Sequence, residues 1–428
     1  MIETVRKAWA IPELRKKIVF TLLIILIYRI GNAIPVPYVD VATLTSYLDS
    51  MSTTVLGLYN VMSGGAFADA TVFALSIQPY INSQIIIQLL TVAIPALERM
   101  SRDEGEEGRK KLMSITRYTT VLIAFIQGFA YYMMMRNQYG ILTDTGIPAA
   151  LVIIISFIAG SAFMMWLGEQ VTEFGIGNGI SILLFASIIS RIPSAVSTLS
   201  QNYTLGNLNV GMIAFIIVGI IALVVLIVHV GDAERRIPVQ YAKRQVGRKM
   251  YGGQNTTLPM KVNMSGVLPI IFAQSIAMLP ATIAAFLPTP AEGGVAAAFM
   301  NAIDTKSVLY MICYFLLIIA FSYFYATIQF NPTEISNNLK RNGGFIPGFR
   351  PGKPTADFIS KVLSKITLFG AIFLGIVAIC PLIAGKIISI SALSIGGTSV
   401  IIVVGVALET VKALENQMLA RQYKGFLG

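Results

Sequence analysis

Residues 210–230 read VGMIAFIIVGIIALVVLIVHV, and residues 231–249 continue as GDAERRIPVQYAKRQVGRK. The first stretch holds no Lys, Arg, Asp or Glu, and it is long enough to cross a hydrocarbon core, which needs about 20 apolar residues. The second stretch is rich in Lys and Arg, which collect on the cytoplasmic side of a membrane. An apolar segment followed by a basic loop indicates a membrane-spanning helix that ends in the cytoplasm.

Apolar segments and polar loops alternate along the whole chain, and this pattern predicts an all-α integral membrane protein with ten spanning helices. The composition supports this class, because 55% of the residues are hydrophobic and 12% are charged, whereas soluble domains carry charge on about a quarter of their residues. The expected spans are 18–34, 71–94, 113–135, 148–167, 179–199, 210–230, 265–287, 308–328, 362–383 and 393–411.

The basic residues orient these spans. The chain has 32 Lys and Arg residues, and nearly all lie at the two ends or in the loops after the second, sixth and eighth spans. Since the basic residues of short loops stay in the cytoplasm, both termini are expected there, with 231–264 and 329–361 as large cytoplasmic loops. The exceptions are Arg29, Arg136, Arg191, Lys306 and Lys386. The net charge of +11 is therefore topogenic, and no specific nucleic-acid sequence binding is expected.

No catalytic, metal or cofactor site is predicted. His229 is the only histidine, and a metal site needs several converging donors. Cys313 and Cys380 fall inside expected spans, which suggests neither a disulfide framework nor a thiolate site. The stretch 348–354, GFRPGKP, lacks the Ser or Thr that binds magnesium in a phosphate loop. We expect a protein that is not an enzyme and that depends on a separate partner for energy.

A polytopic secondary transporter is a competing class. Such proteins place ionisable side chains near the bilayer midplane, but Arg29 is the main charged residue inside an expected span. Glu169, Glu173 and Glu409 stand close to expected span ends. The residues alone therefore favour a conduit with an aliphatic interior or a membrane scaffold with docking loops.

The segment 55–62, VLGLYNVM, is apolar but too short to span, and SGGA follows it. A broken half-helix is tolerated at membrane depth only where protein or a water-filled cavity surrounds it. The segment is therefore either a helix folded back into a funnel or an external amphipathic helix on the membrane surface.

Seven short motifs resemble those of the SecY family, the central channel subunits of bacterial protein translocases. The resemblance runs from the first expected span to the tenth in the same order. The motifs are FALSIQPYI at 73–81, MWLGEQ at 165–170, GIGNGIS at 175–181, YAKRQ at 241–245, FNP at 330–332, GFRPG at 348–352 and GGTS at 396–399.

The resemblance implies two inverted five-helix halves, 1–200 and 201–428, around a central hourglass pore. It implies a lateral gate between the second and third spans on one side and the seventh and eighth on the other. The outward segment of about 55–66 would be the plug. Its residues would include Val55, Leu56, Leu58, Tyr59, Val61, Met62, Ser63, Gly64 and Gly65.

The family's narrow pore ring carries over by motif onto six aliphatic residues. They are Ile77, Ile81, Ile180, Leu184, Ile271 and Ile402. The first two pairs are spaced i, i+4, so each pair shares one helical face. Leu184 stands where Ile is common in relatives, and this change keeps the ring aliphatic. A hydrophobic constriction resists ions, which must shed water to enter it, and offers no charge to a passing chain.

The implied function is a protein-conducting channel of the bacterial cytoplasmic membrane, which translocates unfolded secretory polypeptides and releases membrane segments laterally into lipid. The implied partners are the small membrane subunits SecE and SecG, the motor ATPase SecA, the ribosome, signal sequences with their unfolded preproteins, and membrane lipids. Loops on rigid scaffolds often carry function, and the candidates for motor and ribosome docking are Arg244, Arg248, Lys249 and Arg350.

Overall fold

The computed structural model describes residues 2–50, 55–102, 105–137, 140–206, 209–241, 244–246, 249–251, 255–263, 266–286, 307–388 and 391–424. Most of these residues are helical. The helices are α1 (Ile2–Ala10), α2 (Pro12–Gly31), α3 (Val41–Ser50), α4 (Val55–Met62), α5 (Gln78–Ala93), α6 (Pro95–Arg102), α7 (Gly105–Asn137), α8 (Ile147–Phe174), α9 (Gly179–Ile189), α10 (Ile192–Thr204), α11 (Val210–Asp232), α12 (Leu268–Phe286), α14 (Val308–Gln329), α15 (Pro332–Arg341), α16 (Lys353–Ile388) and α17 (Ser391–Lys424). The strands are β1 (Glu234–Tyr241), β2 (Arg244–Val246), β3 (Lys249–Tyr251), β4 (Asn255–Lys261) and β5 (Gly344–Phe345).

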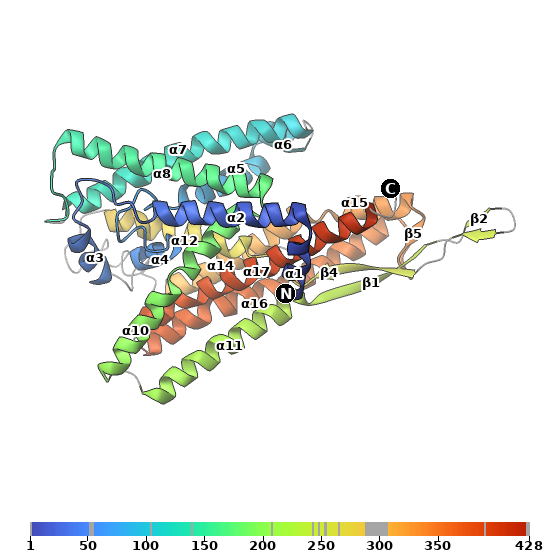
Figure 1. Cartoon of the computed structure of the whole chain (residues 1–428). Helices are drawn as coiled ribbons and strands as arrows, with labels where there is room; N and C mark the ends of the chain where they lie inside the picture. Colours follow the sequence, from blue (N-terminus) through green and yellow to red (C-terminus); the bar gives the residue numbers. More distant parts are fainter. Residues whose placement is uncertain are drawn as a thin grey trace.

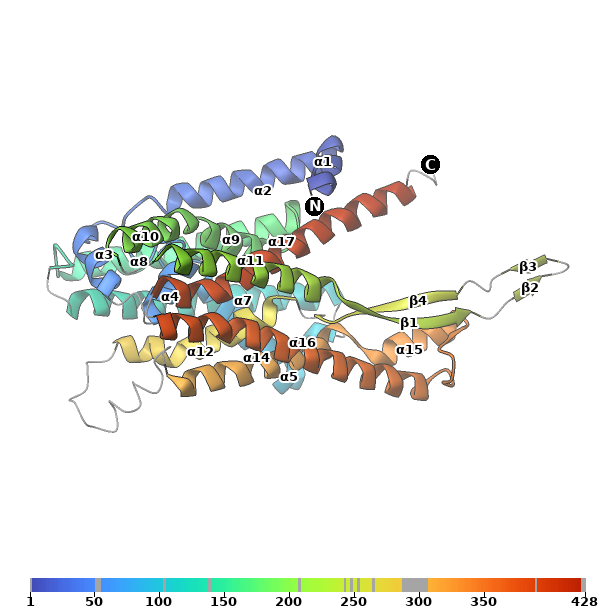
Figure 2. The same ribbon diagram turned by 90° about the horizontal axis from the view of Figure 1, so that it is seen from below.

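Long apolar helices dominate the described chain and lie side by side along its length (Figures 1 and 2). Six helical segments are long and apolar enough to cross a membrane, and α5 with α6 makes a seventh if this pair, bent by 107°, is one span. The protein is therefore a multi-pass membrane protein. The six segments are Gly105–Asn137, Ile147–Phe174, Gly179–Thr204, Val210–Asp232, Val308–Arg341 and Lys353–Ile383.

Helix α5 begins later than the sequence predicted. The span was expected from residue 71, but the backbone stays in turns until Ile77, and the helix starts at Gln78. Ser76 has a φ of 52°, in the left-handed region, and Pro79 favours a first helical turn because its ring fixes φ and removes a donor that would have no partner there. Residues 71–77 therefore form a folded turn instead of the first two turns of a helix.

The close approach of α8 to this turn depends on a glycine. A Cβ placed on Gly160 would lie 1.8 Å from the carbonyl oxygen of Val72. Gly160→Ala is expected to lower the free energy of unfolding by about 1–3 kcal/mol, because the helix must move away from the turn. The measurement is the melting temperature of the purified protein in detergent. Gly219→Ala in α11 is the matched control, since a Cβ added there would meet no described atom within 4 Å apart from its chain neighbours and the backbone of its own helix. An equal drop in both variants would contradict the prediction.

Strands occupy the loops, which the all-α prediction did not include. Strands β4, β1 and β5 form an antiparallel sheet in that order, and β2 pairs with β3 in a short hairpin that projects away from the helices (Figures 1 and 2). Ile237 and Val239 lie two residues apart on β1 and are both buried, as the alternation of a strand requires. They pack with Met260, Ile346 and side chains of α16 in a small core of their own. The sequence signal that could have predicted strand β1 is this alternation of apolar and polar residues within a basic loop.

The first and last described helices, α1 and α17, are in contact. Helix α1 packs on the C-terminal part of α17 through a cluster that contains Ala8, Leu14 and Leu414. The hydroxyl of Thr4 donates to Glu415 Oε1 at 3.1 Å. Helices from the first and last parts of the sequence are thereby joined.

Candidate functional site

The six predicted ring residues lie on four different segments of the chain and are buried together. Ile77 and Ile81 lie at the start of α5, Ile180 and Leu184 on α9, Ile271 on α12 and Ile402 on α17. Each is at most 8% exposed, and all six belong to one hydrophobic core cluster. The amide of Ile81 donates to the carbonyl oxygen of Ile77 at 3.1 Å. The structure thus brings every predicted ring residue into the same interior.

The start of α9 is fixed by polar contacts that orient Ile180. The side-chain oxygen of Asn178 accepts from the amides of Ile180 at 3.0 Å and Ser181 at 3.4 Å, which caps the helix. The amide of Gly179 donates to the hydroxyl of Thr172 at 2.9 Å. A Cβ on Gly179 would lie 2.0 Å from the carbonyl oxygen of Gly168, so only glycine allows α9 to begin this close to α8.

The start of α12 is held against α17. Glu409 Oε1 lies 3.4 Å from the amide nitrogen of Val267, one residue before the helix begins. A carboxylate at this end complements the unpaired amides and the dipole of the helix. Val267 also contacts α17 closely, since a Cβ on Gly405 would lie 2.1 Å from its side chain. These contacts set the position of Ile271 relative to Ile402.

The short apolar segment is the helix α4, and it is buried rather than lying on an outer surface. Leu56, Tyr59 and Met62 are each at most 7% exposed and join the same core cluster as the ring residues. Figure 1 shows α4 beside α12. The side-chain amide of Gln274 on α12 donates to the sulfur of Met62 at 3.4 Å. The side chains of Val55 and Leu58 lie outside the described residues, and Val61 is half-buried.

The turn after α4 is tightly built. Ser63 is buried, and Gly64 and Gly65 have φ values of 70° and 96°, which favour glycine. The amide of Ala68 donates to Asn60 Oδ1 at 3.0 Å, closing the turn on the helix. Farther along, the amide of Val36 donates to the carbonyl oxygen of Ala70 at 2.9 Å. The segment that follows α4 is therefore tied to the end of α2.

Polar contacts join α5 to α12 and α14. The side-chain amide of Gln78 donates to the hydroxyl of Ser275 at 3.0 Å, and the hydroxyl of Tyr325 donates to Gln88 Oε1 at 2.8 Å. Gln78 and Ser275 are both buried. Buried polar groups are costly unless they are paired, so these bonds stabilise the contact between segments far apart in the sequence. Polar residues inside apolar spans were the signal that could have found them.

The predicted docking residues lie on the loops that form the sheet. The backbone of Arg244 and of Lys249 belongs to β2 and β3, while their side chains and all of Arg248 lie outside the described residues. Arg350 is exposed, between Gly348 and Gly352, whose φ values are 88° and 104°. Its own carbonyl oxygen accepts from the hydroxyl of Thr355 at 2.8 Å.

Side chains of α15 and α16 anchor the same loop. The hydroxyl of Ser336 donates to the carbonyl oxygen of Gly352 at 2.7 Å. The rings of Phe349 and Phe358 stack with centroids 4.1 Å apart. The loop therefore presents Arg350 to solvent from a fixed backbone.

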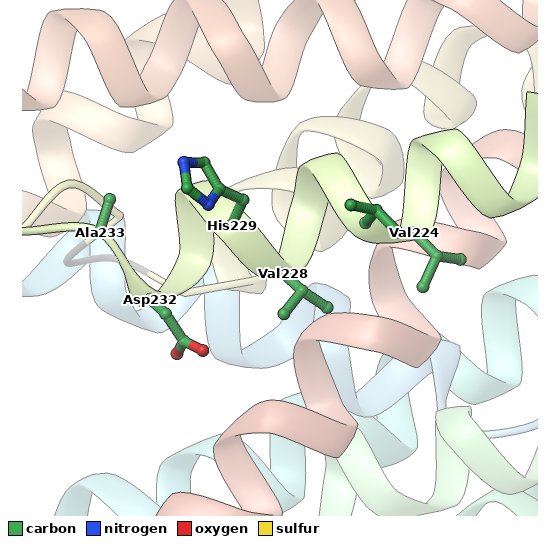
Figure 3. Close-up of a pocket in the computed structure, with 6 residues that line it drawn as sticks. Val224, Val228, His229, Asp232 and Ala233 are labelled. Atoms are coloured by element: carbon green, nitrogen blue, oxygen red, sulfur yellow. The ribbon is translucent and has the colours of Figure 1, made fainter.

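The histidine does not build a reactive site within the described residues. His229 and Asp232 line a surface hollow of about 500 Å³ with Val224, Val228 and Ala233 on and just after α11. The two polar side chains project to different sides of the helix (Figure 3). Across the described part of the chain, no three His, Cys, Asp or Glu residues come together as a metal site would need.

Comparison with known proteins identifies the family. A family model for SecY matches residues 71–411. The protein translocase subunit SecY of Streptomyces scabiei is 44% identical over 441 residues, with 100% of both chains covered. A SecY protein whose plug domain stabilises the closed state of its translocation channel is 18% identical, with a TM-score of 0.67 over 95% of this chain and 93% of that chain.

A second solved structure shares the fold. It is the channel in a canine ribosome-channel complex from the endoplasmic reticulum, with a TM-score of 0.65 at 17% identity over 95% of this chain and 93% of that chain. These two structural likenesses support the fold, whereas the family model and the full-length identity decide the membership. On these grounds the chain belongs to the SecY family.

Proposed function

We propose that this chain forms the protein-conducting channel of a bacterial translocase, through which unfolded secretory polypeptides cross the cytoplasmic membrane. The observation that carries the proposal is that six aliphatic side chains from four segments are all buried and belong to one hydrophobic core cluster. An aliphatic constriction is a poor ion site and offers a passing chain no fixed charge. The SecY relatives are translocase subunits, and this chain is a channel subunit, not an enzyme.

The proposed architecture has ten spans in two five-helix halves, 1–200 and 201–428, with both termini in the cytoplasm. Bonds between α5 and the pair α12 and α14 support a lateral gate between α5 and α7 on one side and α12 and α14 on the other. Through it, membrane segments of the cargo would leave into lipid. The burial of α4 beside α12 supports its role as the plug, with residues of about 55–66 closing the pore from outside.

The proposed partners follow from the family and the loops. The ribosome is supported by the canine ribosome-channel complex, and the motor SecA, the small subunits SecE and SecG, signal sequences and membrane lipids by the role of the channel. The exposed Arg350 and the hairpin with Arg244, Arg248 and Lys249 are the proposed contacts for motor and ribosome. A secondary transporter or a scaffold is not favoured, since the family's members are translocase subunits.

A stalled secretory precursor tests the proposal directly. With a cross-linkable cysteine in Ile81→Cys or Ile271→Cys, the precursor is expected to form a covalent adduct through its mid-section, because both side chains would face the translocating chain. The matched control is Phe369→Cys, whose native side chain is 61% exposed on α16 and would face lipid. Equal adducts at Phe369→Cys, or none at the two ring positions, would contradict a central path through this chain.

A further inference from the structure

The turn 63–65 after α4, called the plug turn below, is held by the backbone of its first residue, Ser63. The carbonyl oxygen of Ser63 accepts a hydrogen bond from the hydroxyl of Tyr28 at 3.1 Å and from the side-chain amide of Asn32 at 3.4 Å. Tyr28 and Ser63 are both fully buried. Because the acceptor is a main-chain oxygen, this anchor does not depend on the side chain at position 63, and it joins the plug to α2.

The same hydroxyl also contacts the helix that carries two ring residues. Tyr28 Oη lies 2.6 Å from Ser187 Oγ on α9. A phenol and a serine hydroxyl each have one proton to donate, and Ser187 Oγ also lies 2.9 Å from the carbonyl oxygen of Leu183. When Tyr28 donates to Ser63, the hydrogen bond between Tyr28 and Ser187 therefore requires the serine hydroxyl to donate to Tyr28 instead of to Leu183. The contacts then form a relay from α9 through α2 to the plug.

Ser187 shares a helical face with the ring. Ile180, Leu184 and Ser187 are spaced i, i+4 and i+7, which places them on one side of α9. A displacement of that face moves the ring side chains and the serine hydroxyl together. Hydrogen bonds weaken steeply as distance and angle depart from their optimum, so a small outward shift of α9 is enough to break the relay.

The plug turn has little room to follow such a shift independently. A Cβ on Gly64 would lie 3.0 Å from the hydroxyl of Ser190 and 3.1 Å from the carbonyl oxygen of Ser187. A Cβ on Gly65 would lie 3.0 Å from the guanidinium of Arg191. The turn is therefore seated on the C-terminal end of α9.

We propose that Tyr28 is a positioning residue that couples widening of the ring to release of the plug. The proposal rests on the channel function proposed above. A polypeptide that enters the ring pushes the Ile180 face of α9 outward, which separates Ser187 from Tyr28 and loosens the hold on the Ser63 carbonyl. In the empty channel the relay keeps the plug in place. Plug release is thereby tied to the arrival of cargo.

Tyr28→Phe removes the hydroxyl and keeps the ring of the side chain. In the complex reconstituted into planar bilayers, the resting ion conductance of this variant is expected to rise about fivefold, the effect of losing one buried hydrogen bond. Tyr132→Phe is the matched control, since Tyr132 is also buried but its hydroxyl has no hydrogen-bond partner among the described residues. A Tyr28→Phe conductance equal to that of wild type and of Tyr132→Phe would overturn the proposal.

Two further measurements distinguish the loss of this relay from a general loss of packing. Ser187→Ala is expected to raise the conductance as Tyr28→Phe does, and the double variant is expected to add little to either, because both changes break one relay. With a stalled precursor in the ring, wild type and Tyr28→Phe are expected to conduct equally, since the relay is already broken.

Additive effects in the double variant, or a difference that persists around the precursor, would contradict the coupling. If instead the precursor never enters the wild-type channel, the channel function itself fails, and the resting conductance of Tyr28→Phe still reports on the plug.

Discussion

Charge reversal at Arg350 is expected to lower motor-driven translocation about thirtyfold or more, because reversing one charge of a docking contact costs several kcal/mol. The backbone of its loop is fixed by Ser336, Thr355 and the stacked pair of Phe349 and Phe358. A new carboxylate at that point cannot readily turn away from the motor. The measurement is the rate at which inverted membrane vesicles containing Arg350→Glu import a secretory precursor when ATP and the motor are supplied.

Arg341→Glu is the matched control for this reversal. Arg341 is also exposed and lies at the end of α15, near the same loop, so the two variants change the net charge equally. We expect Arg341→Glu to keep most of the import rate, and both proteins to accumulate in the membrane at wild-type level. An equal loss in the two variants would mean that the loop needs positive charge in general, and Arg350 would no longer be a specific contact.

The second large effect is expected at the ring. Truncation of Ile81, Ile180 and Ile271 to glycine should raise the ion conductance of the resting channel, because the dry constriction loses the side chains that exclude water. Each side chain contributes about 1.5–3 kcal/mol of apolar burial to the closed state. Three together amount to about 4.5–9 kcal/mol, which shifts the balance between dry and wetted states by roughly a thousandfold or more. Single-channel recording in planar bilayers measures the change.

Glycine also loosens helices, by about 1 kcal/mol per position, so the control must carry the same number of glycines on the same helices. Ile86, Ile189 and Leu279 lie on α5, α9 and α12, and their side chains are 40%, 37% and 38% exposed. We expect the triple glycine variant at these positions to remain closed to ions. Conductance that rises equally in the two triple variants would argue against the ring assignment.

Hydropathy and charge predicted the membrane class because a hydrocarbon solvent constrains a sequence strongly. The expected span 210–230 corresponds to α11, which begins at the predicted residue, and 308–328 corresponds to α14. Burial of the six ring residues was expected only through the resemblance. Every span is apolar, so periodicity cannot distinguish an isoleucine that lines a path from one that packs in a core.

Other features depend on contacts between distant segments, which a local pattern does not contain. The delayed start of α5 reflects the folded turn at Ser76, where a hydropathy window registers only apolar residues. The relay from Ser187 to Ser63 needs Tyr28, which the sequence alone does not distinguish from any other residue of a membrane span. The pairing of β5 with β1 joins residues about a hundred positions apart, and the sequence carried no sign of which strand would be the partner.

That pairing has a mechanical consequence for the whole molecule. Strand β1 continues directly from α11, β4 leads to α12, and β5 connects α15 to α16. A force applied to the projecting hairpin is therefore distributed through the hydrogen-bonded sheet to the helices α11, α12, α15 and α16, instead of bending a single loop. A tag inserted between β2 and β3 would leave this sheet intact. A single residue inserted in β1, the central strand, would shift its pairing with both β4 and β5 and so disturb all of these helices together.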